Sequence, residues 1–194
     1  MTFKKLLGTS IIAATMVVSS LSQAAPAEYE IDMAHTNALF NVNHLGLSNM
    51  LGRFDELTGS LVFDKENIEN SKVEITIATA SINTFHAKRD EHLSSPDFFN
   101  AAEFPEMTFS STSVTKTGEN TAKLTGDLTL LGVTKPVDLD LTINKVGEHP
   151  FNKKQVAGFT ATGNIKRSDF GMKYGVPMIG DDIALRLEME AGLK

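Results

Sequence analysis

The sequence of 194 residues contains no cysteine and no tryptophan. Without cysteine the protein has no disulfide, no thiolate metal ligand and no cysteine nucleophile, so its stability has to come from a packed core. It also lacks a Gly-x-Ser-x-Gly elbow, a phosphate-binding glycine loop and a His-Glu-x-x-His helix. These absences weaken the case for several common enzyme classes without excluding every enzyme.

Positive charge is also scarce, because 18 Lys and Arg stand against 24 Asp and Glu, which gives a net charge of -6. Lys and Arg do not gather into a basic cluster. Nucleic acids and anionic membrane surfaces select basic proteins. We therefore expect no nucleic-acid partner.

The amino terminus has the pattern of a cleaved secretory signal peptide. Two early lysines are followed by a mostly apolar run that ends at Leu21, and small residues for cleavage end at Ala24. The apolar run is too short and too interrupted to be a membrane span. We predict a signal peptide over 1–24 and an exported, soluble mature chain that folds as one domain over 25–194.

In the mature chain, apolar and polar residues alternate in about eight segments separated by turn residues. This pattern is typical of an all-β sandwich or barrel. The alternation is clear over residues 72–82, 122–131, 137–143 and 183–189. We also predict one strand over 53–63, preceded by a turn or short helical piece over 47–51. On an earlier strand, His44 shares a face with Phe40 and Val42, where a buried, hydrogen-bonded histidine is expected.

Phenylalanine dominates the aromatic residues, with 12 Phe against two Tyr. An eight-stranded barrel is just wide enough to be filled by side chains or to enclose one ligand. Phe has no polar tip, so an open barrel would favour an apolar ligand such as a prenyl or acyl chain, whereas the same residues could also form a solid core. Tyr29 and Tyr174 are too few for the aromatic girdles of a membrane-spanning barrel, and we expect a barrel in water.

A segment rich in Phe, His and charged residues, 85–109, interrupts the strand pattern. Asn83 or Thr84 is predicted to cap a short helix there. Helical spacing would bring together Phe85, Arg89, His92 and Leu93. Such a face suits the mouth of a ligand cavity, and it equally suits a helix that plugs a barrel end with its charges in water.

Metal binding and catalysis find little support in this segment. His86 and Asp90 share a helical face, but His92 falls elsewhere on the helix. A prearranged metal site is therefore not expected, and we predict no metal and no cofactor.

Several motifs occur in a fixed order along the mature chain. They are Asp32-x-x-His35, Phe40-x-Val42-x-His44, Gly52-Arg53-Phe54, Arg89-Asp90-x-His92-Leu93, Asp97-Phe98-Phe99, Gly132-Val133-Thr134-Lys135-Pro136 and Arg167-Ser168-Asp169-Phe170-Gly171. Together they resemble the YceI-like family. The resemblance implies an extended lipocalin-like antiparallel eight-stranded β-barrel with a short helical insertion, located in the bacterial periplasm. It also implies a carrier or storage protein, without established catalytic residues, that holds a polyisoprenoid such as a prenyl quinone or prenyl phosphate.

Carried onto this sequence, the resemblance implies two groups of ligand-binding residues. The lipid tail would contact Phe40, Val42, Phe54, Phe85, Leu93, Phe98, Phe99 and Phe109. The polar candidates for the head group are His44, Arg53, Arg89, Asp90 and His92. Many family members have His at the position of Leu131, so here Leu131 is expected to extend the apolar wall.

Two other functions stay open at this point. One is a lipid- or quinone-modifying enzyme that uses His92 with Asp90. The other is a stress-related interaction protein with a solid barrel. A homodimer through an exposed strand edge or through the insertion is compatible with the sequence.

Overall fold

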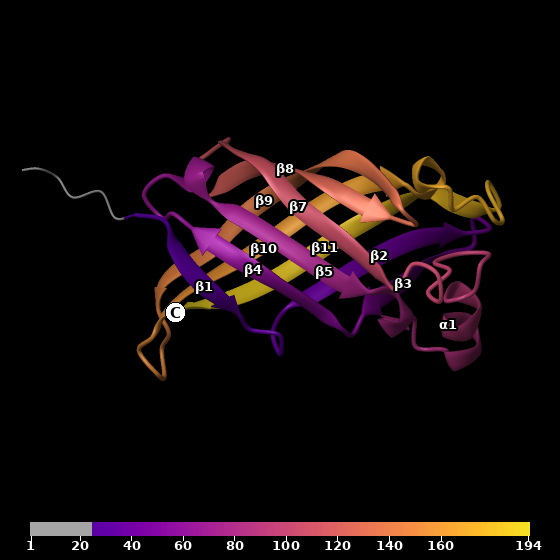
Figure 1. Ribbon diagram of the computed structural model, residues 1–194, viewed down its shortest axis with the longest axis horizontal. Coiled ribbons are helices and arrows are strands. Elements are labelled where there is room, and N and C mark those ends of the chain that lie inside the picture. The colour runs from indigo at the N-terminus through magenta and orange to yellow at the C-terminus, as the bar shows by residue number, and fades with distance from the viewer. Residues whose placement is uncertain (1–24) are drawn as a thin grey trace, which may run out of the picture.

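The alternating segments form eleven strands in the computed structural model, which describes residues 25–194 (Figure 1). The predicted signal peptide lies outside the described residues. The strands are β1 (Ala27–Ile31), β2 (Asn37–His44), β3 (Ser48–Phe54), β4 (Leu57–Phe63), β5 (Lys72–Ala78), β6 (Ile82–Asn83), β7 (Glu106–Lys116), β8 (Thr121–Leu130), β9 (Val133–Glu148), β10 (Gln155–Lys166) and β11 (Ile179–Leu193). One α-helix, α1 (Ala87–Leu93), and three 3-10 turns, Ile68–Asn70, Thr79–Ser81 and Arg167–Phe170, complete the described chain.

Eight antiparallel strands close into a ring in the order β1-β4-β5-β7-β8-β9-β10-β11. The ring closes where β1 pairs with the end of β11, with Tyr29 opposite Leu193. The remaining strands extend it, because β2 pairs with β11, β3 with β2, and β6 with β3. Thus β1 and β2, β3 and β4, and β5 and β6 each form one barrel strand that a bend interrupts. The predicted eight-stranded barrel with a short helical insertion is confirmed.

The predictions for residues 47–63 were partly wrong. The turn lies earlier than expected, at Leu45 and Gly46, which both have positive φ angles of 56° and 71°. Two successive positive φ angles match the right-handed twist of a tight hairpin, so β3 already begins at Ser48. The predicted single strand 53–63 bends at Asp55, whose backbone N–H donates to Ser81 O at 3.0 Å.

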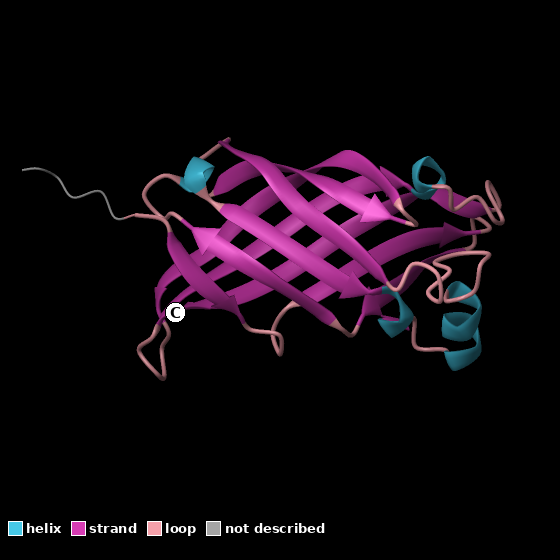
Figure 2. Ribbon diagram, in the orientation of Figure 1, coloured by secondary structure: helices cyan, strands magenta, loops and turns pink. Residues whose placement is uncertain are grey.

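The insertion lies at one end of the barrel, where α1 contacts β6 (Figure 2). The helix begins later than predicted, because His86 is its cap and accepts a hydrogen bond from the backbone of Arg89. Phe85 precedes the helix with a φ of 64°. The predicted face that joins Phe85 to Arg89, His92 and Leu93 is therefore not formed.

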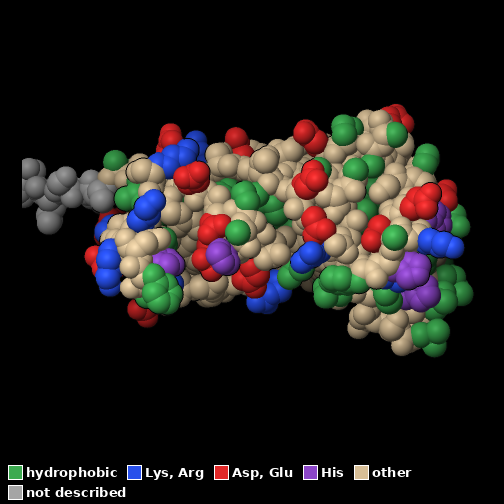
Figure 3. Space-filling view, turned by 90° about the horizontal axis from the view of Figure 1, so that it is seen from below, with side chains coloured by type: hydrophobic (Ala, Val, Ile, Leu, Met, Phe, Trp, Pro, Cys, Tyr) green, Lys and Arg blue, Asp and Glu red, His purple; other side chains and the backbone are tan. Residues whose placement is uncertain are grey.

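At the opposite end, aromatic rings pack against one another inside the barrel. Phe63 makes edge contacts with Tyr29 and Phe159, at centroid distances of 5.7 and 5.2 Å, and all three side chains are buried. Acidic and basic side chains are interspersed on the outer face seen in Figure 3. Among the described residues, no helix is long and apolar enough to cross a bilayer.

Candidate functional site

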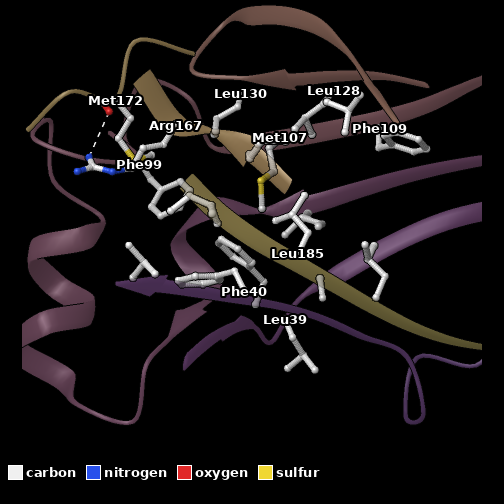
Figure 4. Close-up of a pocket in the computed structure, with 18 of the residues that line it drawn as sticks. Leu39, Phe40, Phe99, Met107, Phe109, Leu128, Leu130, Arg167, Met172 and Leu185 are labelled. Carbon is white, nitrogen blue, oxygen red and sulfur yellow. Dashed lines mark hydrogen bonds between the residues drawn. The ribbon is translucent and has the colours of Figure 1, made fainter. Parts of the chain in front are cut away.

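An apolar cavity of about 160 Å³ lies inside the half of the barrel that carries α1 (Figure 4). Its wall comes from the inward faces of β2, β3, β5, β7, β8, β9, β10 and β11, and from the insertion. One water molecule needs roughly 10–15 Å³ in this measure, so the space is about ten times larger. The solid-barrel alternative is therefore wrong for this structure.

Seven of the eight residues predicted to contact a lipid tail line this cavity. They are Phe40, Val42, Phe54, Leu93, Phe98, Phe99 and Phe109. Ring contacts order some of these side chains, since the Phe54 ring lies edge-on to Phe99 at 5.4 Å between centroids and is tilted against Phe40 at 5.8 Å. The structure brings these side chains together from four separate segments, and their contact with a lipid stays a prediction.

Phe85 is the exception, and its predicted place in the wall was wrong. Its side chain is 68% exposed, because the positive φ angle before α1 turns it away from the barrel. The ring lies under the Arg53 guanidinium, with 5.8 Å between Cζ and the ring centroid. It therefore packs on the outer surface.

The polar candidates on β2 and β3 also lie outside the cavity. His44 is exposed at the last position of β2, where the strand runs past the wall residue Val42, so the predicted buried histidine was wrong. Arg53 alternates with the inward Phe54 and consequently points outward, with its Nε 2.7 Å from Asp55 Oδ1.

Arg89 and Asp90 form hydrogen bonds within the insertion and do not line the cavity. The backbone N–H of Thr84 donates to Asp90 Oδ1 at 2.8 Å, and its hydroxyl donates to the same oxygen. Arg89 Nε donates to Thr84 Oγ1 at 2.7 Å. Because Thr84 is only 4% exposed, these bonds fix the start of α1 against β6, and the expected head-group role at the mouth finds no geometric basis.

His92 lies on the outer side of the insertion. Its Nε2 is 3.0 Å from Asp97 Oδ2, and both side chains are half exposed. The imidazole makes edge contacts with Phe98 and Tyr174, so Phe98 separates it from the cavity. His92 and Asp90 have different partners, and the pairing that an enzyme mechanism would need is not formed.

Arg167 is a cavity-lining residue that sequence reasoning missed as a site residue. It is the single polar side chain in the cavity wall within residues 25–194, and it is 3% exposed. Its guanidinium donates to three backbone oxygens, those of Gly180 at 2.9 Å and Ile179 at 3.0 Å and that of Met172 at 3.2 Å, the last of which Figure 4 shows as a dashed line. Burial lowers the pKa of Arg167.

No carboxylate neutralises this buried cation directly. None of the ion pairs among residues 25–194 includes Arg167. Asp181, the acidic neighbour that acts on it, is instead held by the backbone N–H and hydroxyl of Ser168 at 2.9 and 2.8 Å. A cation that faces an apolar cavity without a direct counter-ion is costly unless something else stabilises it.

Most of the other missed wall residues come from the second half of the chain, and four come from β2 and β5: Ala38, Leu39, Ile75 and Ile77. They are the inward residues of regular strands, among them Met107, Leu128, Leu130, Val137, Leu139, Ile165, Ile183, Leu185 and Leu187. The alternation along β8, β9 and β11 contains the signal that would have found them.

Comparison with known proteins agrees with this architecture. The model of the YceI-like domain matches residues 29–191. Protein YceI from Escherichia coli O157:H7 is 41% identical over 189 residues, which span 96% of each chain. The chain belongs to the YceI-like family. Protein YceI from Shigella flexneri is 40% identical over the same coverage.

Solved structures of YceI-like and related proteins have the same fold. The crystal structure of a Campylobacter jejuni YceI protein is 38% identical and has a TM-score of 0.73, covering 78% of this chain and 90% of that one. Burkholderia cenocepacia BcnA has a TM-score of 0.76 at 21% identity, over 83% of this chain and 99% of that one. A polyisoprenoid binding domain from Saccharophagus degradans has a TM-score of 0.64 at 16% identity, over 88% and 100%. At these low identities the last two show the fold alone.

Leu131 was expected to extend the apolar wall, but it is not among the residues that line the cavity. It occupies the two-residue turn between β8 and β9 with Gly132, and both residues have positive φ angles, 52° and 72°. A tight hairpin needs this geometry, and the half-buried Leu131 side chain packs against the core without reaching the cavity. The preceding residue, Leu130, lines the cavity instead.

Proposed function

We propose that the protein binds a long-chain polyisoprenoid lipid inside its barrel and serves as a periplasmic carrier or storage protein. One observation carries the proposal: the cavity wall is apolar throughout except for a single buried cation at one end. A lipid with a long hydrocarbon tail and one polar head matches that distribution. The polyisoprenoid binding domain from Saccharophagus degradans, which shares the fold, supports this choice of ligand.

The tail would gain its binding energy from the aromatic and aliphatic wall. Each buried CH₂ contributes about 0.8 kcal/mol, before the cost of ordering a flexible chain. Phe40, Phe54 and Phe99 already pack against one another, so the wall loses little freedom when a chain enters.

The head group would lie at the end of the cavity near Arg167. A guanidinium has five N–H donors, and three of them are used by backbone oxygens. Two donors therefore remain for the carbonyl oxygen of a prenyl quinone or for an oxygen of a prenyl phosphate. Either head group would accept from these donors, and a prenyl phosphate would also supply the negative charge that no carboxylate of the described residues brings directly to Arg167.

The test is to purify the exported protein without detergent, record its native mass, and identify what organic extraction releases. We expect one prenyl quinone or prenyl phosphate per chain. A bare mass of the mature chain, unchanged after incubation with both lipids, would overturn the proposal. An Ala38→Phe variant, which places a ring in the cavity, is the control and should carry less lipid.

A further inference from the structure

Five large apolar side chains are exposed at the end of the barrel that carries α1. Two lie in the hairpin between β2 and β3, and three lie in the loop that leads from the last 3-10 turn into β11 (Figure 1). None of the five belongs to the apolar side chains that form or pack against the core of residues 25–194. We call them the apolar rim: Leu45, Leu47, Tyr174, Val176 and Met178.

The hairpin and the loop form one continuous surface. The backbone N–H of Leu45 donates to the backbone oxygen of Met178 at 2.9 Å, which joins the two segments. On its other side the loop meets the insertion, because the Tyr174 ring makes an edge contact with Phe98 at 5.2 Å between centroids. The apolar rim therefore extends from the hairpin across the loop to the insertion.

The apolar rim is also continuous with the wall of the cavity. Met172 and Ile179 flank the loop and line the cavity, and Val42 lines it three residues before Leu45. Arg167 donates to the backbone oxygens of Met172 and Ile179, so the loop is held at both ends. A fixed loop thus presents apolar side chains to the outside, directly beside the apolar interior.

Folding does not explain why these exposed residues are apolar. Leu45 has a φ of 56° at a hairpin position where Asn, Asp or Gly is preferred. Leu131 has a similar φ, but its side chain packs against the core. Leu45 has no such contact with the core, and Leu47 is 82% exposed. A contiguous exposed apolar patch marks a surface that binds a protein or a membrane.

The charges around the apolar rim favour a membrane. Residues 44–50 and 170–180 contain no Asp or Glu, and Lys173 is their single Lys or Arg, although the chain as a whole is acidic. Lipid phosphates would repel carboxylates, and none is present in these two segments. A lysine can lay its stem along an apolar surface and keep its ammonium among the head groups. Tyr, as at position 174, is enriched at the membrane–water interface.

We infer that the apolar rim docks on the surface of a phospholipid bilayer, with Leu47 and Met178 inserted at the boundary between head groups and acyl chains. The inference rests on the proposed function, because a polyisoprenoid dissolves in a bilayer and not in water. Docking brings the cavity end of the barrel to the place where such a lipid is found. A single lysine adds little attraction, so apolar insertion drives docking and an uncharged bilayer is sufficient.

The test measures how purified, lipid-free protein partitions onto phosphatidylcholine vesicles in a sedimentation assay. The double variant Leu47→Asn with Met178→Gln should lower the partition coefficient about tenfold or more, because it removes the two most exposed side chains of the apolar rim. Raising the salt to about 0.5 M NaCl should not weaken the binding of the unaltered protein, since salt screens only charges.

Phe151→Asn is the matched control. Phe151 is 89% exposed, but it lies in the hairpin between β9 and β10, at the opposite end of the barrel (Figure 1). Its replacement removes an exposed apolar side chain without touching the apolar rim. Vesicle binding of this variant should equal that of the unaltered protein.

The absence of cysteine allows a second measurement that does not depend on the double variant. Leu47→Cys and Phe151→Cys each provide one site for a fluorophore that is sensitive to polarity. When vesicles are added, the emission of the label at position 47 should shift to shorter wavelength. The label at position 151 should show no shift.

The outcomes separate docking from lipid binding, which native mass spectrometry with an isoprenoid alcohol measures without vesicles. Protein that binds the alcohol but stays off vesicles, or docks equally well as the double variant, overturns the inference and leaves the proposed function standing. A dimer in solution that the double variant abolishes, without vesicle binding, overturns it in favour of contact between two copies. Protein that docks through the apolar rim but binds no isoprenoid supports the docking surface and overturns the proposed function.

Discussion

The ring of Phe40 lies directly against Gly52, its partner across β2 and β3. A Cβ atom at position 52 would stand 2.2 Å from Cζ of Phe40, closer than two carbon atoms can approach. Phe109 and Gly126 make a similar contact, since a Cβ at position 126 would lie 2.3 Å from Cζ of Phe109. In both places a missing side chain lets a phenylalanine lie flat, so the barrel has aromatic walls and an open interior.

Gly52→Ala should therefore move the Phe40 ring into the apolar cavity that it lines. All three close contacts of the added Cβ are with ring atoms of Phe40, so the ring must rotate or shift. We expect about 1–3 kcal/mol of destabilisation from overpacking and a lower affinity for every isoprenoid chain length. Urea unfolding and lipid titration measure the two effects.

Gly192→Ala is the control for this substitution, because a Cβ there meets nothing within 4 Å and the residue is also in a strand. It should change neither quantity appreciably. Equal lipid affinity of Gly52→Ala and Gly192→Ala would show that Gly52 does not keep the cavity open.

Asp90 and His92 should differ sharply when each is replaced by Ala. Asp90→Ala leaves the buried N–H and hydroxyl of Thr84 without their acceptor, which costs about 1–3 kcal/mol. His92→Ala removes only a half-exposed pair with Asp97, which contributes about 1 kcal/mol or less. The free energies of unfolding in urea compare the two variants.

Local hydrogen exchange adds a second measurement for this pair of variants. Exchange in α1 should accelerate in Asp90→Ala and stay nearly unchanged in His92→Ala. A greater loss of stability in His92→Ala than in Asp90→Ala would contradict the view that the Thr84 contacts hold the insertion.

The barrel and most of its apolar wall were predictable from the sequence for a simple physical reason. On a strand with one buried face, the alternation of apolar and polar residues indicates which side chains face inward. Phe40, Val42 and Phe54 face inward as this alternation predicts. The count of barrel strands came out right although β3 and β4 were merged, because a bend at Asp55 keeps both pieces in the same strand of the ring.

The polar part of the candidate site depends on features that no local pattern carries. His44 lies on the same alternating face of β2 as Phe40, but beyond the last wall residue of that strand. The alternation of apolar and polar residues does not show where a barrel ends. Phe85 is turned outward by one backbone angle. Arg167 is buried because Ile179 and Gly180, more than ten residues later, fold back over it.

A pH-dependent contribution to stability is expected from His35 and Asp32, whose Nδ1 and Oδ2 atoms are 2.8 Å apart. The hydrogen bond to Asp32 raises the pKa of His35, with a smaller effect from Glu190, and the same bond lowers the pKa of Asp32. The contribution of His35 is present below about pH 6.5 and is lost as the pH rises through its raised pKa. That of Asp32 is present above about pH 3.9 and is lost as the pH falls through its lowered pKa.

The pair should thus stabilise the fold most between about pH 4 and pH 6.5. His35→Gln should lower the free energy of unfolding more at about pH 5.5 than at about pH 8.5. Urea unfolding of both proteins at the two pH values measures the difference. A difference that does not change with pH would show that protonated His35 has no stabilising partner.

Arg167→Met should loosen the chain between Gly171 and Gly180. Met has a similar length and suits the apolar cavity, but it leaves three backbone oxygens without the guanidinium donor. We expect a loss of about 1–3 kcal/mol for each oxygen left unsatisfied, offset in part because a buried cation is removed. Hydrogen exchange should become faster in this segment, and denaturant unfolding gives the free energy.

Arg167→Lys separates charge from geometry. A lysine keeps the positive charge, but its compact ammonium cannot reproduce the planar fork of an arginine, so it should restore only part of the lost protection between Gly171 and Gly180. Lys166→Met is the control, because its ammonium makes an exposed ion pair with Asp182 at 2.9 Å, which contributes little. If amide hydrogens between Gly171 and Gly180 exchange as slowly in Arg167→Lys as in the unaltered protein, a single positive charge is enough to hold this segment. The hydrogen bonds of the guanidinium to three backbone oxygens would then not be required.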